Sequence, residues 1–116
     1  MPNPRYRPRG YALDGDRFGK AAEIEWRTAD DLTIEEDDDQ LAAAQLQHVI
    51  ALSIRGAYSK RHMSRREFAD YAGIPDRRLG EILNGDTIMR LEHIALAQRA
   101  LGLSPSEVNL LQTGPE

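Results

Sequence analysis

The sequence predicts a single all-α domain of five helices that follows an irregular N-terminal extension. The chain has 116 residues, which is the size of one ordinary domain. Apolar residues recur at helical spacing from residue 39 onward. Aromatic residues make up only 6% of the chain, which is few for a β-sandwich. We therefore place the extension at residues 1–38 and the helical domain at residues 39–112.

The N-terminal extension divides into a basic part and an acidic part. Residues 1–20 carry five basic and two acidic side chains and several prolines, so we expect a flexible, extended arm. Residues 21–39 carry nine acidic side chains and one arginine. Ile24 and Trp26 alternate with polar residues there, which is a weak strand pattern. The acidic run at 35–39 complements the positive end of a helix dipole, and a protein-binding acidic segment is the alternative.

A long helix is predicted from about Asp39 to Tyr58, and a short helix follows it. Ser64 and Glu67 have the S-x-x-E spacing of a capping box, in which each side chain bonds the other residue's backbone amide. Gly73 ends the short helix, because glycine adopts the left-handed conformation without steric cost. The side chains expected to face inward from these two helices are Leu46, Val49, Ile50, Ser53, Ile54, Ala57, Phe68, Ala69 and Ala72.

Three more helices are predicted further along the chain. The third begins near Pro75 and ends at Gly85. The fourth covers about residues 88–101, and Gly102 ends it. The fifth covers residues 104–111 and opens on a second S-x-x-E capping box. The side chains expected to face inward from the third and fourth helices are Leu79, Ile82, Leu83, Leu91, Ile94, Ala95 and Leu101.

Residues 64–85 hold two short helices whose connection permits a steep crossing. Ala69 is small where the helices would meet, and Gly73 permits a left-handed residue in the turn. These two conditions are the geometric requirement of a helix-turn-helix, whose second helix enters the major groove of B-DNA. The outward face of that second helix is expected to carry Asp76, Arg77, Arg78, Gly80, Glu81 and Asn84.

Residues 63–85, MSRREFADYAGIPDRRLGEILNG, resemble the helix-turn-helix of lambda-repressor-like regulators of the Cro/XRE family. The family's cap, mid-helix, turn and end residues are matched by Ser64, Ala69, Gly73, Asn84 and Gly85. The resemblance covers about residues 45–110. One departure is Pro75, which stands where the family often has a polar capping residue. The resemblance implies the lambda-repressor-like fold.

The resemblance also implies DNA contacts for eight residues. Arg77 is the first candidate for a base contact, since arginine commonly bonds guanine O6 and N7, and Arg78 would contact a base or, instead, a phosphate. Arg65 would contact the DNA backbone and buttress the recognition helix. Asp76 and Glu81 would accept from cytosine N4 or orient the neighbouring arginines. The full candidate set is Ser64, Arg65, Asp76, Arg77, Arg78, Gly80, Glu81 and Asn84, the last of them a phosphate contact.

The function implied is that of a sequence-specific transcription regulator, a repressor that binds double-stranded DNA as a homodimer. The dimer surface is expected around Val108, Leu110 and Leu111 or around Ile24 and Trp26. The arginines of the arm, Arg5, Arg7 and Arg9, are candidates for a minor-groove contact. The alternative is an antitoxin that binds a protein toxin through residues 1–40. A third hypothesis is a protein-interaction module that has lost DNA binding.

Other chemistry has little support in the sequence. The chain has no cysteine, so disulfides and thiol nucleophiles are excluded. His48, His62 and His93 lack the spacing of a metal site, and we expect neither a cofactor nor enzymatic activity. No apolar run approaches the roughly 20 residues that cross a bilayer. We expect a cytoplasmic protein of bacterial or phage origin, associated with the nucleoid through DNA.

Overall fold

The structure, a computed structural model, is helical, as the sequence predicts. It describes residues 7–28, 30, 32 and 38–102. Within them it has four α-helices and no strand, and the fifth predicted helix lies outside the described residues. The elements are two short 3-10 turns, η1 (Pro8–Tyr11) and η2 (Gly15–Arg17), and the helices α1 (Asp38–Lys60), α2 (Arg65–Ala72), α3 (Asp76–Asn84) and α4 (Leu91–Leu101).

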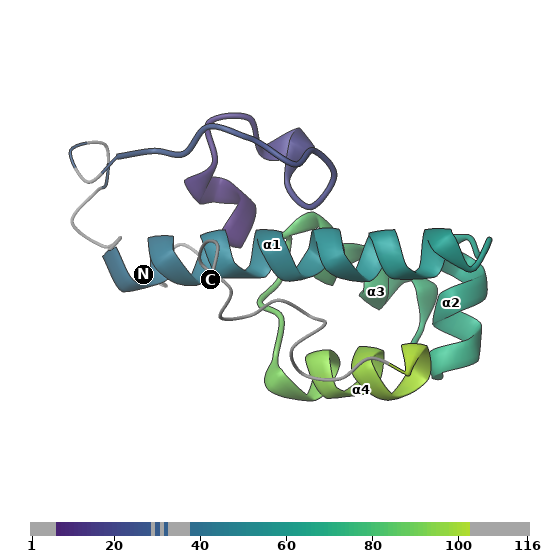
Figure 1. The fold of residues 1–116 in the computed structure, drawn as a ribbon. Helices are drawn as coiled ribbons and strands as arrows, with labels where there is room; N and C mark the ends of the chain where they lie inside the picture. The colour runs from purple at the N-terminus through teal and green to yellow at the C-terminus, as the bar shows by residue number, and fades with distance from the viewer. Residues whose placement is uncertain (1–6, 29, 31, 33–37, 103–116) are drawn as a thin grey trace, which may run out of the picture.

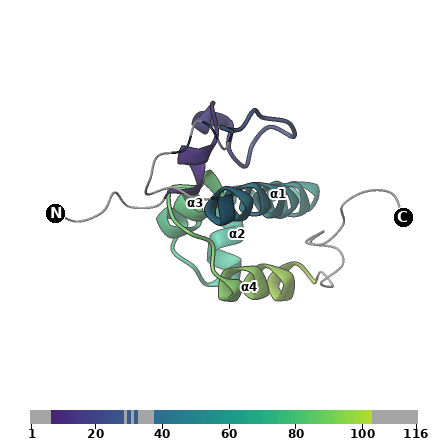
Figure 2. The ribbon, with the colours of Figure 1, turned by 90° about the vertical axis from the view of Figure 1, so that its left-hand side faces the viewer.

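Helix α1 is the longest element, and the other described helices and the described N-terminal residues lie around it (Figure 1). Asp38 and Asp39 lie in its first turn, where their negative charges interact favourably with the positive end of the helix dipole. Figure 2, which looks along α1, shows α3 beside it and α4 on the side opposite the N-terminal residues. The core cluster consists of Ile50, Ala51, Ile54, Tyr58, Phe68, Ala69, Leu79, Leu83, Ile94, Ala97 and Leu101.

The buried face of α1 differs from the predicted one in its first half. Ile50 and Ile54 are buried as predicted, but Leu46 and Val49 are exposed, so that part of the prediction is wrong. Gln47 and His48 are buried instead. Both have a polar partner from another segment, and these hydrogen bonds offset the cost of burying polar groups.

The predicted inward face of α4 is also partly wrong. Ile94 and Leu101 are buried, but Leu91 is 80% exposed and Ala95 is exposed, while Ala97 takes the inward position. The helix begins at Leu91 rather than at residue 88, because the preceding segment is an extended loop. The first buried side chain of α4 is therefore Ile94, about one helical turn after Leu91, where the apolar pattern predicts it.

The N-terminal segment is packed against the helices, so the expectation of a flexible arm is wrong for its described part. We call residues 7–28 the N-terminal lobe. Pro8, Tyr11 and Phe18 are buried, and the Tyr11 hydroxyl donates to Gln40 Oε1 of α1 at 2.6 Å. The weak strand pattern appears only as one antiparallel bridge between Ala12 and Trp26.

His48 joins the lobe to α1. Its Nδ1 accepts a hydrogen bond from the Gly19 amide at 2.8 Å. The imidazole lies edge-on between two aromatic rings, with centroids 5.3 Å from Phe18 and 5.5 Å from Trp26. Burial lowers the pKa of His48, since it disfavours the charged imidazolium. The neutral imidazole is thus the form that the packed lobe accommodates.

Candidate nucleic-acid interface

Helices α2 and α3 are the two short helices that the sequence predicts, and they pack against each other. The predicted capping box is present: Ser64 Oγ accepts from the Glu67 amide at 3.1 Å, and Glu67 Oε1 accepts from the Ser64 amide at 2.8 Å. Gly73 ends α2 in the left-handed conformation, with φ of 83°. Pro75 is the N-cap of α3, and its fixed φ suits the entry to the next helix. The turn between the helices is therefore fixed at both ends by local backbone chemistry.

Arg65 and Asp76 connect the first turns of α2 and α3. Arg65 Nε and Nη2 donate to the two carboxylate oxygens of Asp76 at 2.9 and 3.1 Å, which is a bidentate pair. The hydrogen bond with Arg65 lowers the pKa of Asp76, and the same bond raises that of Arg65. Asp76 therefore orients Arg65, and the prediction that it orients Arg77 or Arg78 is wrong.

Gly80 explains how Arg65 reaches across α3. A Cβ at Gly80 would lie 2.7 Å from Arg65 Nη1, so a side chain there would displace the guanidinium. Gly80 is buried beneath Arg65 and not open on the outward face, which corrects its predicted position. The side chain exposed to solvent above Gly80 is that of Arg65, which is 38% accessible.

The outward face of α3 presents two arginines in its first turn. Arg77 and Arg78 are both exposed, and the Arg77 side chain is 91% accessible. Glu81 lies one turn further along, with its carboxylate 3.5 Å from Arg77 Nε. The opposite face of α3 is buried through Leu79, Ile82 and Leu83. The helix thus has one face fixed in the core and one face open to a partner.

The C-terminal end of α3 makes a contact that the sequence does not predict. Arg55 Nη2 of α1 donates to Asn84 Oδ1 at 2.7 Å. Arginine has only donors, so the Asn84 oxygen must face it and the Asn84 amide nitrogen must point elsewhere. The spacing of 29 residues between the two side chains gives no local signal of this contact.

Gln47 is a second residue that supports the site and that the sequence did not predict. Its Nε2 donates to the carbonyl oxygens of Ile82 and Thr87, each at 2.9 Å, and its Oε1 accepts from the Met89 amide at 2.9 Å. One buried side chain thereby fixes the last turn of α3 and the loop that follows it. A glutamine among apolar helix positions was the available signal.

The N-terminal lobe holds the same loop from the other side. The Arg9 amide donates to the Gly85 carbonyl at 2.9 Å, and Arg9 Nη1 pairs with Asp86 at 3.0 Å. Arg7 Nη2 pairs with the same Asp86 oxygen at 2.8 Å. Arg7 and Arg9 are therefore engaged with the loop after α3, whereas Arg5 lies outside the described residues.

The described residues offer neither a metal site nor a membrane-spanning helix. No group of three histidine, cysteine, aspartate or glutamate side chains there is arranged to hold a metal ion. No helix in the described part of the chain has the length and apolar character needed to span a bilayer.

Comparison with known proteins identifies the helix-turn-helix segment. A family model described as "Helix-turn-helix" matches residues 54–108, which include α2, α3 and α4. No curated protein and no solved structure matches the chain. Residues 54–108 are thus a helix-turn-helix domain of the Cro/C1, XRE-like family, the domain of DNA-binding transcription regulators.

Proposed function

We propose that the chain is a sequence-specific transcription regulator that reads the major groove of double-stranded DNA with α3. The observation that carries the proposal is the exposed first turn of α3, with Arg77 and Arg78 on a helix whose other face is buried. Arginine donates to guanine O6 and N7 in the major groove. Arg77 is assigned to a base edge, and Arg78 to a base edge or a phosphate.

The remaining candidate residues have supporting roles in the proposal. Arg65, oriented by Asp76, would contact a phosphate at the start of α2, where the helix dipole also favours an anion. Ser64 contributes as the cap that fixes this helix start. Glu81 pairs with Arg77, and its negative charge disfavours DNA sites that would bring a phosphate close to the Glu81 carboxylate.

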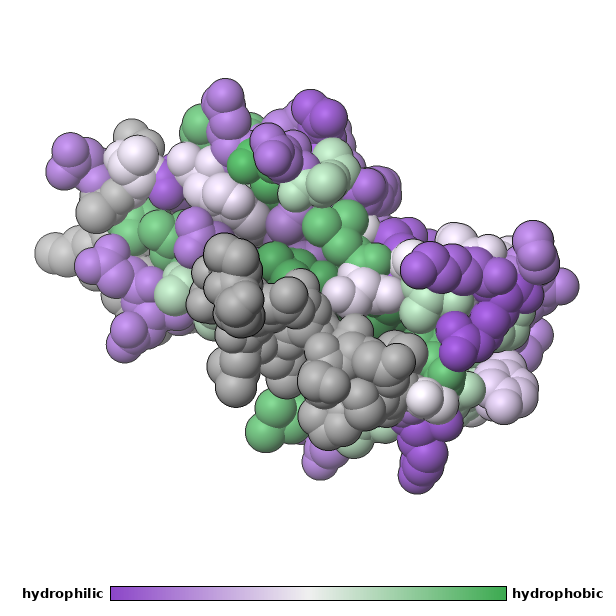
Figure 3. All heavy atoms as spheres, viewed as in Figure 1, coloured by the Kyte–Doolittle hydropathy of each residue, from purple (hydrophilic) through white to green (hydrophobic). Residues whose placement is uncertain are grey.

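The proposed mode of action is repression by occupancy of an operator on nucleoid DNA, with the chain acting as a homodimer. Two copies would place their recognition helices about one DNA turn, roughly 34 Å, apart. Exposed apolar side chains support a second contact surface: Leu46 and Val49 on α1, Ile88 before α4 and Leu91 at its start. Figure 3 shows hydrophobic side chains among hydrophilic ones on the part of this face that is not covered by grey atoms. Trp26 packs against Phe18 and His48, so it is less suited to that role.

The test begins with selection of bound sequences from random duplexes. The proposal expects enrichment of a site with two related half-sites, bound by the native chain and lost when both Arg77 and Arg78 are replaced by alanine. Circular dichroism checks that the double variant is folded. A folded double variant that binds the selected site with native affinity would remove the assignment of α3.

An antitoxin that binds a protein toxin through the N-terminal extension is the second candidate. This candidate is favoured by a hollow of about 410 Å³ on the lobe. The hollow combines three carboxylates with apolar surface, which suits a basic segment of a partner protein. Its lining residues are Leu13, Asp14, Arg17, Glu23, Ile24 and Glu25. Co-purification of a basic protein that is released by a Glu23→Lys, Glu25→Lys double variant would support this candidate.

A further inference from the structure

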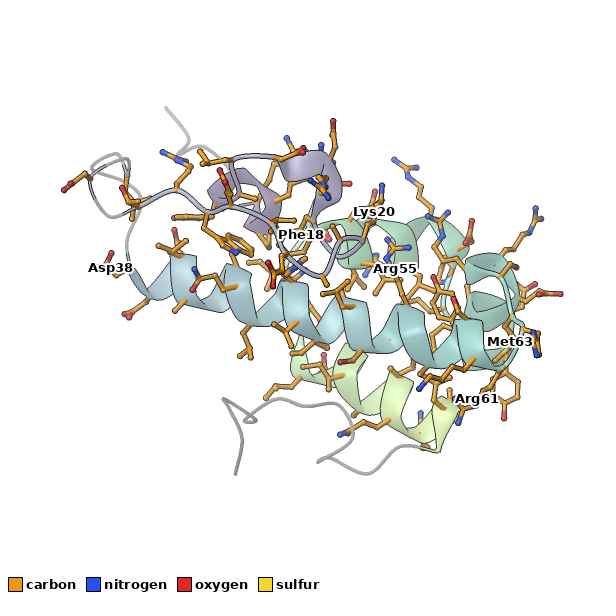
Figure 4. All side chains as sticks on the ribbon, turned by 45° about the horizontal axis from the view of Figure 1, so that its top comes forward. Phe18, Lys20, Asp38, Arg55, Arg61 and Met63 are labelled. Atoms are coloured by element: carbon orange, nitrogen blue, oxygen red, sulfur yellow. The ribbon has the colours of Figure 1, made fainter. Side chains whose placement is uncertain are left out.

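A cluster of hydrogen-bond donors lies at the C-terminal end of α3, outside the helix's first turn. Asn84 directs its amide nitrogen away from Arg55, because its oxygen accepts the 2.7 Å bond from Arg55 Nη2. Lys20 of the N-terminal lobe is exposed, and no carboxylate in the described part of the chain forms an ion pair with it. Figure 4 shows Lys20 and Arg55 on the same side of the molecule, over α3.

Lys20 is held close to α3 by the residue before it. Gly19 has φ of 71°, and a Cβ there would collide with the Leu83 carbonyl oxygen and approach Ala51 of α1. The Gly19 amide is bonded to His48. Because Ala51 lies one helical turn before Arg55 and Leu83 immediately precedes Asn84, these contacts bring Lys20 beside the Arg55–Asn84 pair.

The charges around this cluster favour an anion. Asp86, the acid nearest along the chain, is shared by Arg7 and Arg9, and Glu81 is turned toward Arg77. The C-terminal end of a helix carries partial negative charge, so an anion approaches it only where cations compensate. Arg55 and Lys20 supply that compensation.

We infer that Lys20, Arg55 and the Asn84 amide bind one DNA phosphate beside the major groove that α3 reads. The inference rests on the proposed DNA-binding function and extends it. It makes the N-terminal lobe part of the DNA interface, although Lys20 lies outside the segment that matches the helix-turn-helix family. The lobe thereby adds a backbone contact at one end of the recognition helix, while Arg65 supplies one near the other end.

The experiment measures the affinity of the full chain for its selected duplex by fluorescence anisotropy at several salt concentrations. Each phosphate contact contributes about 0.9 to the negative slope of log K against log salt. The Lys20→Ala variant should therefore bind several-fold more weakly at low salt and lose about 0.9 of slope. Lys20 is exposed, so this variant should keep the native fold. Arg99→Ala, an exposed cation on α4, is the matched control and should keep the native slope.

A neutral methylphosphonate, introduced at each backbone position in turn, locates the contact. At one DNA position the methylphosphonate should weaken binding of the native chain but have little further effect on binding of the Lys20→Ala variant. If Lys20→Ala keeps the native slope and no methylphosphonate couples to it, while the Arg77→Ala, Arg78→Ala double variant loses the site, the inference is wrong and the proposed function stands. If the double variant also keeps native binding, the proposed function itself fails.

Discussion

Replacing Gln47 with leucine tests whether one buried amide holds the end of the recognition helix. Leucine has a similar size, so the change mainly removes the three hydrogen bonds to Ile82, Thr87 and Met89. A typical intramolecular hydrogen bond contributes about 1 kcal/mol net, and a buried group left without a partner costs about 1–3 kcal/mol. Gln47 is 6% exposed. The free energy of unfolding should therefore fall by about 3 kcal/mol.

Urea denaturation followed by circular dichroism measures this loss. For a domain of about 60–100 residues, 1 kcal/mol corresponds to a shift in Tm of about 4–8 °C, so the variant should also melt at least about 10 °C lower. Gln45→Leu, an exposed position on the same helix, is the control and should change stability by less than about 0.5 kcal/mol. A loss below about 1 kcal/mol at Gln47 would refute the reasoning, because it would mean that the loop finds other partners.

Three further predictions follow from other contacts. Gly19→Ala should detach the lobe and lower the free energy of unfolding, measured by urea denaturation, by more than about 1–2 kcal/mol, which is the cost of a left-handed alanine alone. Gly56→Ala is the control, because a Cβ there points into open space on α1, and it should raise the free energy of unfolding by about 0.5–1 kcal/mol. Because the pKa of His48 is lowered in the fold, the unfolded chain binds more protons below pH about 6.5, so stability should fall as pH drops through that range. His48→Gln should reduce that pH dependence, and an unchanged profile would contradict the assignment. Asp76→Asn should release the guanidinium that it orients and weaken DNA binding several-fold in an anisotropy titration; native affinity would show that the pair is not needed.

The local features of the helix-turn-helix could be predicted from the sequence, because they depend on residues a few positions apart. The Ser64–Glu67 capping box, the left-handed Gly73 and the end of α3 at Gly85 each follow from local backbone chemistry, and all three are confirmed. The buried face of α3 is confirmed as well, since its apolar residues have clear helical spacing.

The contacts that fix the site depend on residues far apart, and sequence reasoning missed them. The bond from Arg55 to Asn84 and those from Gln47 to the loop after α3 join side chains on different elements. The packed lobe was missed because residues 1–20 are rich in proline, glycine and arginine, whereas the buried side chains that anchor the lobe, Pro8, Tyr11 and Phe18, are few and show no regular spacing. Leu46 was assigned to the core by periodicity alone, which does not show what covers a helix face.

The most direct test of the proposed function compares bases and side chains in one thermodynamic cycle. Each guanine of the selected site is replaced in turn by 7-deazaguanine, which lacks the N7 acceptor in the major groove. The account predicts that at least one replacement weakens binding of the native chain by about 1–3 kcal/mol and has little effect on Arg77→Ala. If every replacement weakens the native chain and Arg77→Ala equally, or if none affects either, then Arg77 of α3 does not contact a guanine in the major groove.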